Sequence, residues 1–195
     1  MDLFWEFLKT VAGGMIAAII TLAVSGRRLD KDLERASRML AIQLTDIFER
    51  FALECAAIPN QHAGNRREAP NDYGGIAPLP TVQNLPTDDA GWRALDAALA
   101  IDARTFDTRR QQSANVVSNI AEYGDADDIE GEVEDQAIIL GDAAWKLALT
   151  FRERYKLGPT HIGWNVADHF AQGFARMAQQ KEQNALYAAE MRAEL

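Results

Sequence analysis

The sequence predicts an all-α protein, in which an N-terminal transmembrane helix runs into an antiparallel bundle of about four long helices. Three observations lead to this prediction. Five of the six prolines lie between Pro59 and Pro86, so most of the chain lacks the strongest helix breaker. Elsewhere the good helix formers Ala, Leu, Glu, Gln and Arg dominate. An uncharged run opens the chain, and apolar residues then recur at helical spacing.

The uncharged run covers residues 10–25 and reads TVAGGMIAAIITLAVS. At about 1.5 Å per residue it spans roughly 24 Å, and the apolar residues from Leu3 onward extend it to the roughly 20 residues that a membrane helix needs. Phe4 and Trp5 are typical of the headgroup level. We therefore expect residues 1–26 to form a membrane anchor. A cleaved signal peptide and a buried soluble helix are the alternatives.

Small residues recur four positions apart inside this run, at Gly13 and Ala17 and at Gly14 and Ala18. Such a surface lets two membrane helices approach closely, which makes a homo-oligomer a hypothesis. The residues assigned to the predicted anchor are Phe4, Trp5, Thr10, Gly13, Gly14, Ala17, Ala18 and Ser25.

Basic residues beside the run predict its orientation. Lys9 precedes it, whereas five Lys or Arg residues follow it closely. Because the larger number belongs on the cytoplasmic side, we expect a single-pass protein of the inner (plasma) membrane, with its N-terminus outside and residues 27–195 in the cytoplasm. The basic residues that would lie near the lipid headgroups are Arg27, Arg28, Lys31, Arg35 and Arg38.

Apolar residues continue at spacings of three and four after the anchor, which predicts one long helix, or two nearly collinear ones, as far as Ile58. Cys55 lies on this stripe and is expected to be a small core residue rather than a nucleophile. The stripe consists of Leu29, Leu33, Ala36, Leu40, Leu44, Ile47, Phe51, Cys55 and Ile58.

Residues 59–91 are rich in turn-forming residues, and helical periodicity disappears there. We expect a long Pro/Gly-rich loop, which is either a strap on the bundle surface or a segment that binds a protein partner. The apolar residues of this segment favour the strap, because they could pin it to the bundle. The candidate partner-binding residues are Tyr73, Ile76, Leu79, Pro80 and Leu85.

Acidic residues after this loop are suited to cap the next helix. Its inward-facing stripe is predicted to consist of Trp92, Leu95, Leu99, Ala103 and Phe106. The apolar pattern weakens over residues 107–112 and is then predicted to continue with Val116, Ile120 and Tyr123. Gly124 is the expected stop, so the segment forms one bent helix or two.

Two further helices complete the predicted bundle. Acidic residues after Gly124 and basic residues before Gly158 fit the dipole of a helix between them. The last helix begins near Trp164, and its polar end beyond Ala178 is expected to fray or protrude. Its predicted inward stripe consists of Ala167, Phe170, Phe174 and Met177.

No motif of the sequence indicates a chemistry, so we expect no enzyme activity, no cofactor and no metal. An EF-hand loop starting at Asp125 fails, because Glu130 stands at the sixth position, where Gly is needed. His161 and His169 are eight positions apart and lack the spacing that places two imidazoles on one metal ion. The net charge of −9 argues against nucleic acid as a partner.

The segment ILGDAAWKLALTFRERYKLG, which ends at Gly158, and the segment LPTDDAGWRALD (residues 85–96) accompany the N-terminal run. Together they resemble small bacterial membrane-anchored helical proteins of unknown function, which implies one anchored helical unit and no assigned activity. We expect a membrane-tethered interaction or scaffold module with an unidentified protein partner. The alternatives are a sensor-like bundle that binds a small ligand and signals through the stalk helix, and a membrane-active protein in which the anchor itself acts.

Overall fold

The structure is a computed structural model. It describes the backbone of residues 2–68, 75–160 and 162–193, and the side chains of residues 28–67, 75–160 and 162–192. Every regular element in these ranges is a helix, which confirms the predicted all-α class. The chain divides into two compact units, Met1–Leu40 with Asp88–Leu95, and Ala41–Thr87 with Asp96–Leu195. The second is called the bundle unit below.

Helix α1 (Asp2–Glu68) is longer than predicted. It does not end at Ile58, and Pro59 lies inside it, so the predicted loop over residues 59–91 is wrong for residues 59–68. Proline removes one backbone donor but does not change which side of the helix is buried. Ile58 and His62, one helical turn apart, are both 1% exposed, so the buried side continues past Pro59.

The predicted membrane anchor falls on residues whose side chains lie outside the described part of the structure, from Phe4 to Ser25. Across the described residues, no helix combines the length and the apolar character needed to cross a membrane. Arg27 also lies outside the residues with described side chains. The basic residues after it are exposed, namely Arg28, Lys31, Arg35 and Arg38.

In the first unit, the short helix α2 (Asp89–Ala94) begins as predicted at an acidic cap. The Asp88 side chain accepts a hydrogen bond from the backbone N–H of Ala90 at 3.1 Å. Gly91 lies close to Leu40, because a Cβ at position 91 would stand 3.0 Å from the Leu40 Cβ. Trp92 is buried, as predicted.

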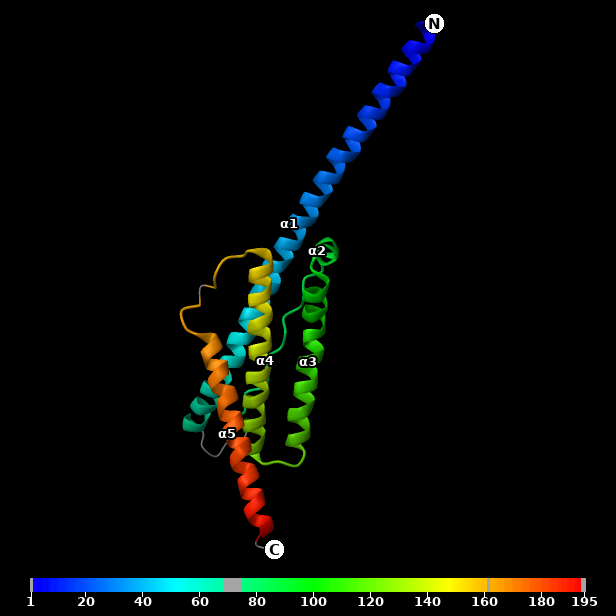
Figure 1. Cartoon of the computed structure of the whole chain (residues 1–195). Coiled ribbons are helices and arrows are strands. Elements are labelled where there is room, and N and C mark those ends of the chain that lie inside the picture. The colour runs from blue at the N-terminus through cyan, green and yellow to red at the C-terminus, as the bar shows by residue number, and fades with distance from the viewer. Residues whose placement is uncertain (1, 69–74, 161, 194–195) are drawn as a thin grey trace. The chain divides into compact units, whose positions relative to one another are not determined.

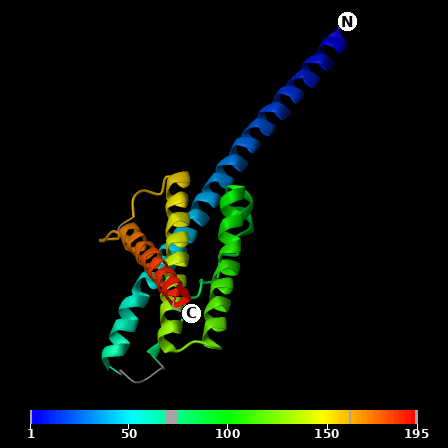
Figure 2. The same cartoon turned by 60° about the horizontal axis from the view of Figure 1, so that its bottom comes forward.

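The bundle unit contains residues 41–68 of α1 together with α3 (Ala97–Ala121), α4 (Ala126–Tyr155) and α5 (Val166–Ala193). Helix α4 packs against both α3 and α5 (Figures 1 and 2). The sequence predicts one bent helix or two after residue 88. The structure has two helices there, α2 and α3.

Helix α4 has the ends that its sequence predicts. At its start, Asp125 and Asp128 form a reciprocal capping box. At its end, Lys156 adopts a left-handed conformation with φ of 51°, and the Leu157 N–H donates to the Arg152 carbonyl. The acidic start and the end before Gly158 were predicted, because both are local in the sequence, whereas the capping box itself and the left-handed Lys156 were not.

Aromatic rings from three helices form the core of the bundle unit. The Phe106 ring lies 5.2 Å from the rings of Phe48 and Phe51, and Phe151 stacks 6.4 Å from Phe48. Most residues of the stripes predicted for α1, α2 and α3 are buried, and Ala36 and Ile120 are half-buried. Four others are exposed and were predicted wrongly as inward-facing: Leu29, Leu33, Val116 and Tyr123.

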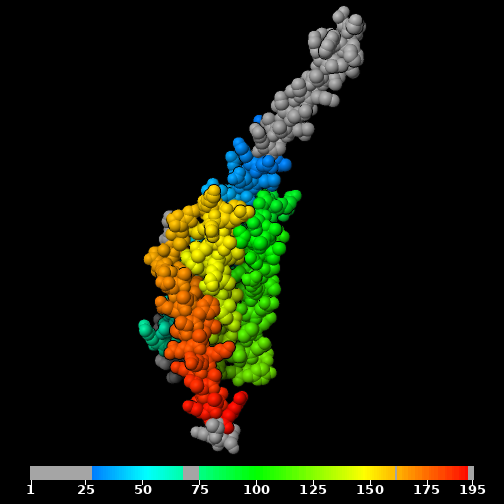
Figure 3. Space-filling model, in the orientation of Figure 1, coloured from blue at the N-terminus to red at the C-terminus, as the bar shows by residue number. Residues whose placement is uncertain are grey.

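Helix α5 buries only part of the predicted stripe. Phe170 is buried as predicted and Met177 is half-buried, whereas Ala167 and Phe174 are exposed, and Val166 and Gly173 are buried in their place. Gly173 lets α5 approach α4, because a Cβ there would lie 2.6 Å from Ile138 Cδ1. Of the two alternatives for its polar end, protrusion is the one observed: the helix continues to residue 193, and its last turns extend past the turn that joins α3 and α4 (Figures 1 and 3).

Candidate functional site

Residues 75–87 form a strap that belongs to the bundle unit. Its Ala77 N–H donates to His62 Nε2 at 3.0 Å, and the Asn65 side chain donates to the Gly75 carbonyl. Leu79 is buried. Of the other candidate partner-binding residues, Ile76, Pro80 and Leu85 are half-buried, whereas Tyr73 lies outside the described residues.

His62 lies where α1, α4 and the strap meet, and it is 1% exposed. Because its Nε2 accepts a hydrogen bond from Ala77, the hydrogen of the neutral ring is on Nδ1. This Nδ1 lies 3.2 Å from Glu134 Oε1, to which it donates, and 3.6 Å from Glu130 Oε1. The imidazole therefore connects the strap to two carboxylates of α4.

Glu130 and Glu134 are one helical turn apart on α4, so their side chains leave the same side of the helix. They are 13% and 21% exposed. Arg66 pairs with Glu130 at 3.0 Å. One ligand atom from each of His62, Glu130 and Glu134 lies within 4.8 Å of the others, and these three residues could hold a metal ion.

A hollow of about 210 Å³ adjoins this cluster. Its wall includes Arg66, Asp127, Gly131 and both glutamates. Gly131 leaves space beside them, because a Cβ at this position would meet nothing within 4 Å. The hollow gives water and small ions access to the two glutamates.

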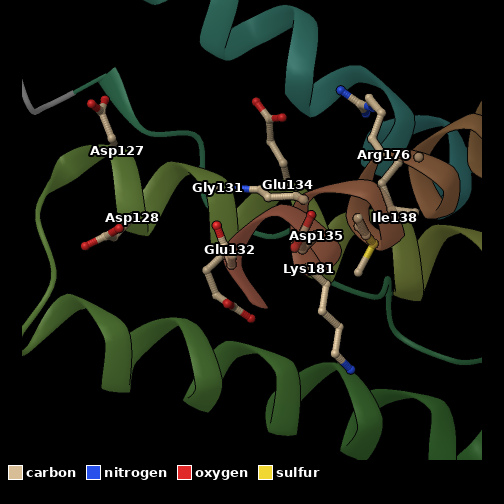
Figure 4. Close-up of a pocket in the computed structure, with 13 residues that line it drawn as sticks. Asp127, Asp128, Gly131, Glu132, Glu134, Asp135, Ile138, Arg176 and Lys181 are labelled. Atoms are coloured by element: carbon tan, nitrogen blue, oxygen red, sulfur yellow. The ribbon is translucent and has the colours of Figure 1, made fainter. Parts of the chain in front are cut away.

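A larger groove of about 440 Å³ runs between α4 and α5. Acidic residues of α4 line one wall, and Arg176 and Lys181 of α5 lie on the other (Figure 4). Burial raises the pKa of Asp135, and the neighbouring charges of Glu132 and Glu134 raise it further, while Arg176 opposes them. The groove therefore carries more negative than positive charge.

A second polar connection between α1 and α4 lies among the aromatic rings. Arg152 donates two hydrogen bonds to the Glu49 carboxylate, at 2.6 and 2.9 Å, and two more to the carbonyls of Gly158 and Pro159 at 3.1 Å each. The hydrogen bond to Glu49 raises the pKa of Arg152. Because one acid is paired with one base and both are hydrogen-bonded, we interpret this ion pair as a contact that stabilises the fold.

Cys55 is a core residue, as the sequence predicts. It is 0% exposed. Burial raises the pKa of its thiol, and the charge of Glu54 adds to this effect. A thiol held in its protonated form is a poor nucleophile.

The other two histidines, His161 and His169, lie away from this cluster in the sequence. His161 lies outside the described residues. The His169 ring contacts the Trp164 and Phe170 rings edge-on, each 5.6 Å away. Burial lowers the pKa of His169, and Arg176 lowers it further.

The cluster around His62 is not apparent from the sequence. His62 and Glu134 are 72 positions apart, so no local spacing connects them. The only available signal was the one-turn spacing of Glu130 and Glu134, and that spacing is common on solvated helix faces. Ending the first helix at Pro59 also removed His62 from the helix that presents it.

Comparisons of the chain with protein-family models, with curated proteins and with solved structures found no match. The function is therefore argued from the residues of this chain.

Proposed function

We propose that this protein is a membrane-tethered helical interaction module, with residues 1–26 in the inner membrane and residues 27–195 in the cytoplasm. The uncharged run at residues 10–25, followed by basic residues, is the observation that carries the proposal. Two features of the structure support it. The backbone of α1 is helical through this run, and the basic side chains at positions 28, 31, 35 and 38 are exposed.

The second half of α5 supports a protein partner. Every side chain from position 178 to 192 is exposed, including Leu186, Tyr187 and Met191, which are 61%, 66% and 48% exposed. A helical segment without packing is marginal in water, because most helix stability in proteins comes from a buried face. A partner that covers Leu186, Tyr187 and Met191 would supply that face.

The placement is tested by fusing two reporters after Leu195. One is alkaline phosphatase, which is active only outside the cytoplasm, and the other is a fluorescent protein that matures only inside. We expect fluorescence without phosphatase activity, and the fusion in the membrane fraction. Replacing Arg27, Arg28 and Lys31 with Gln should produce a mixed orientation. Phosphatase activity of the unmodified chain would overturn the orientation, and a fusion found only in the soluble fraction would overturn the anchor.

The partner surface is tested by crosslinking the full chain in cells. We expect a reproducible crosslinked species that is lost when Leu186, Tyr187 and Met191 are replaced with Glu. The matched control replaces Gln179 and Gln183 with Glu, which adds charge to the same exposed helix without removing apolar area. Equal loss in both variants would mean that added charge, and not the apolar surface, is responsible. Retention in both would contradict the proposed surface.

The sensor-like bundle is the second candidate function, and the position of His62 favours it. His62 lies on α1, the helix that also contains the predicted anchor, so a ligand at this residue would contact the stalk helix directly. A sensor should show stabilisation by its ligand of about 2.7 kcal/mol at a hundredfold excess over Kd. A screen of metal ions and metabolites by thermal unfolding that yields no shift would contradict this function.

A further inference from the structure

We propose that His62, Glu130 and Glu134 bind one divalent transition-metal ion of the Zn²⁺ type, in exchange for the hydrogen bond between His62 and the strap. This inference goes beyond the proposed interaction module and does not depend on it. Imidazole and carboxylate donors together suit Zn²⁺ and its first-row neighbours, whereas Mg²⁺ and Ca²⁺ prefer oxygen ligands alone.

The distances between the donor atoms fit such an ion. In a tetrahedral site with bonds of about 2.0–2.2 Å, neighbouring ligand atoms stand about 3.4 Å apart. His62 Nδ1 lies 3.2 Å from Glu134 Oε1 and 3.6 Å from Glu130 Oε1. The two glutamate oxygens lie within 4.8 Å of each other, so they would move together by at most about 1.4 Å to reach the tetrahedral spacing. All three donors belong to helices of the same unit.

The charges of the cluster favour a cation. Two carboxylates lie beside one neutral imidazole, and Arg66 pairs with Glu130. One negative charge is therefore in excess, and Asp127 on the wall of the same hollow adds another. Because both glutamates are largely removed from water, a divalent ion would interact with them more strongly than with an exposed acidic surface.

The hollow beside the cluster supplies the remaining coordination positions. Three protein ligands leave at least one position of a zinc ion for water or a further ligand. The hollow of about 210 Å³ adjoins both glutamates and has space at Gly131. The ion could therefore enter and remain in contact with solvent.

Metal binding requires a change at the strap. A metal ion on His62 Nδ1 needs the lone pair of that nitrogen, so the ring hydrogen must move to Nε2. Nε2 currently accepts the Ala77 N–H at 3.0 Å, and two donors would then face each other. Metal binding and this hydrogen bond therefore exclude each other, so the ion should release Ala77 from His62.

The test is calorimetric titration of the purified full chain with Zn²⁺, followed by ¹⁵N NMR of the same sample. We expect one Zn²⁺ per chain and a change in the ring-nitrogen shifts of His62 that shows metal on Nδ1. The Ala77 amide should shift and lose protection from hydrogen exchange. Mg²⁺ at the same concentration should produce none of these changes.

Variants separate this site from incidental binding. His62→Gln and Glu134→Gln should each weaken Zn²⁺ binding at least tenfold, whereas His169→Gln should leave it unchanged. Glu134→Gln keeps an oxygen that can accept from His62, so it tests the site even if His62→Gln does not fold. No Zn²⁺ binding, equal binding by Glu134→Gln and the unmodified chain, or binding with an unchanged Ala77 amide would each overturn the proposal.

Discussion

The bundle unit has two halves that are joined by different chemistry. The aromatic half contains Phe48, Phe51, Phe106 and Phe151, whose rings are packed between α1, α3 and α4. The polar half contains His62, Arg66, Glu130 and Glu134, which connect α1 to α4 through hydrogen bonds and ion pairs. Both halves join α1 to α4, one through packed aromatic rings and the other through polar contacts.

The two halves also differ in the balance of acidic and basic groups. In the aromatic half, Glu49 and Arg152 are one acid and one base with four good hydrogen bonds. In the polar half, two carboxylates face one guanidinium and a neutral imidazole. Pairing in equal numbers explains the first arrangement as a structural one, whereas an uncompensated charge that is partly removed from water normally lowers stability. The second arrangement therefore agrees with the proposed cation site.

The largest expected effect is in the aromatic half. Phe48 is 0% exposed and contacts the rings of two other helices, so Phe48→Ala should lower the free energy of unfolding by about 3–5 kcal/mol. Urea unfolding followed by circular dichroism measures it. Ile101→Ala is the control, because Ile101 is 62% exposed and should change stability by less than about 0.5 kcal/mol. Similar losses for both would show that the ring cluster is not the main core.

The balanced ion pair should give the next largest effect. Glu49→Gln leaves the Arg152 guanidinium partly buried without its carboxylate, which should cost about 1–3 kcal/mol. Asp46→Asn is the matched control, because Asp46 pairs with Arg50 on the exposed side of the same helix and should cost at most about 0.5 kcal/mol. Chemical unfolding of both variants at equal ionic strength provides the measurement. Equal costs would contradict the structural role of Arg152.

A Glu→Gln substitution in the polar half should lower the free energy of unfolding much less than Glu49→Gln does. In metal-free protein Glu134→Gln keeps an acceptor for the His62 Nδ1–H and removes one excess negative charge, so its effect should stay within about 0.5–1 kcal/mol. Comparing it with Glu49→Gln by urea unfolding in the presence of a chelator tests the contrast between the halves directly. A loss as large as that of Glu49→Gln would mean that Glu134 is structural.

Local signals explain which parts of the fold the sequence could predict. Helix α4 was predicted with both ends, because its cap at Asp125 and its stop at Gly158 are adjacent to it in the sequence. The sequence allows a bend between Phe106 and Val116, but α3 is continuous there and the break lies between Ala94 and Ala97. Asp96 caps α3, and its N–H donates to the Tyr155 hydroxyl, 59 positions away, at 2.8 Å. Contacts of this kind depend on the fold and leave no spacing pattern.

The two larger errors have related physical reasons. Pro59 was taken as a helix end, but burial of the same side of α1 before and after it keeps the helix intact. The stripe of α5 was predicted from apolar spacing, which includes Phe170 but omits Gly173, a buried position that has no side chain and lets Ile138 approach. In both cases tertiary packing outweighed the local preference of a single residue.

The smallest expected effect concerns the acidic groove of α4 and α5, and here substitution should stabilise. Burial and the charges of Glu132 and Glu134 raise the pKa of Asp135 above its ordinary value of 3.8. The folded chain then holds the proton to higher pH than the unfolded chain, so stability falls as pH rises through this window. Asp135→Asn removes the penalty and should add about 0.3–0.5 kcal/mol at pH 7, where the carboxyl is charged.

The pH dependence of the stabilisation by Asp135→Asn distinguishes an effect of charge from an effect of packing. The stabilisation by Asp135→Asn should disappear below pH 3.8, where the carboxyl is protonated in both states. Asp142→Asn is the control on the same helix, because Asp142 pairs with Lys146 at 2.7 Å and its substitution should destabilise by a similar amount. Urea unfolding at several pH values measures both. A destabilised Asp135→Asn variant at pH 7 would show that favourable contacts hold this carboxylate in the wall of the groove, and that the neighbouring acids of α4 do not make its charge unfavourable.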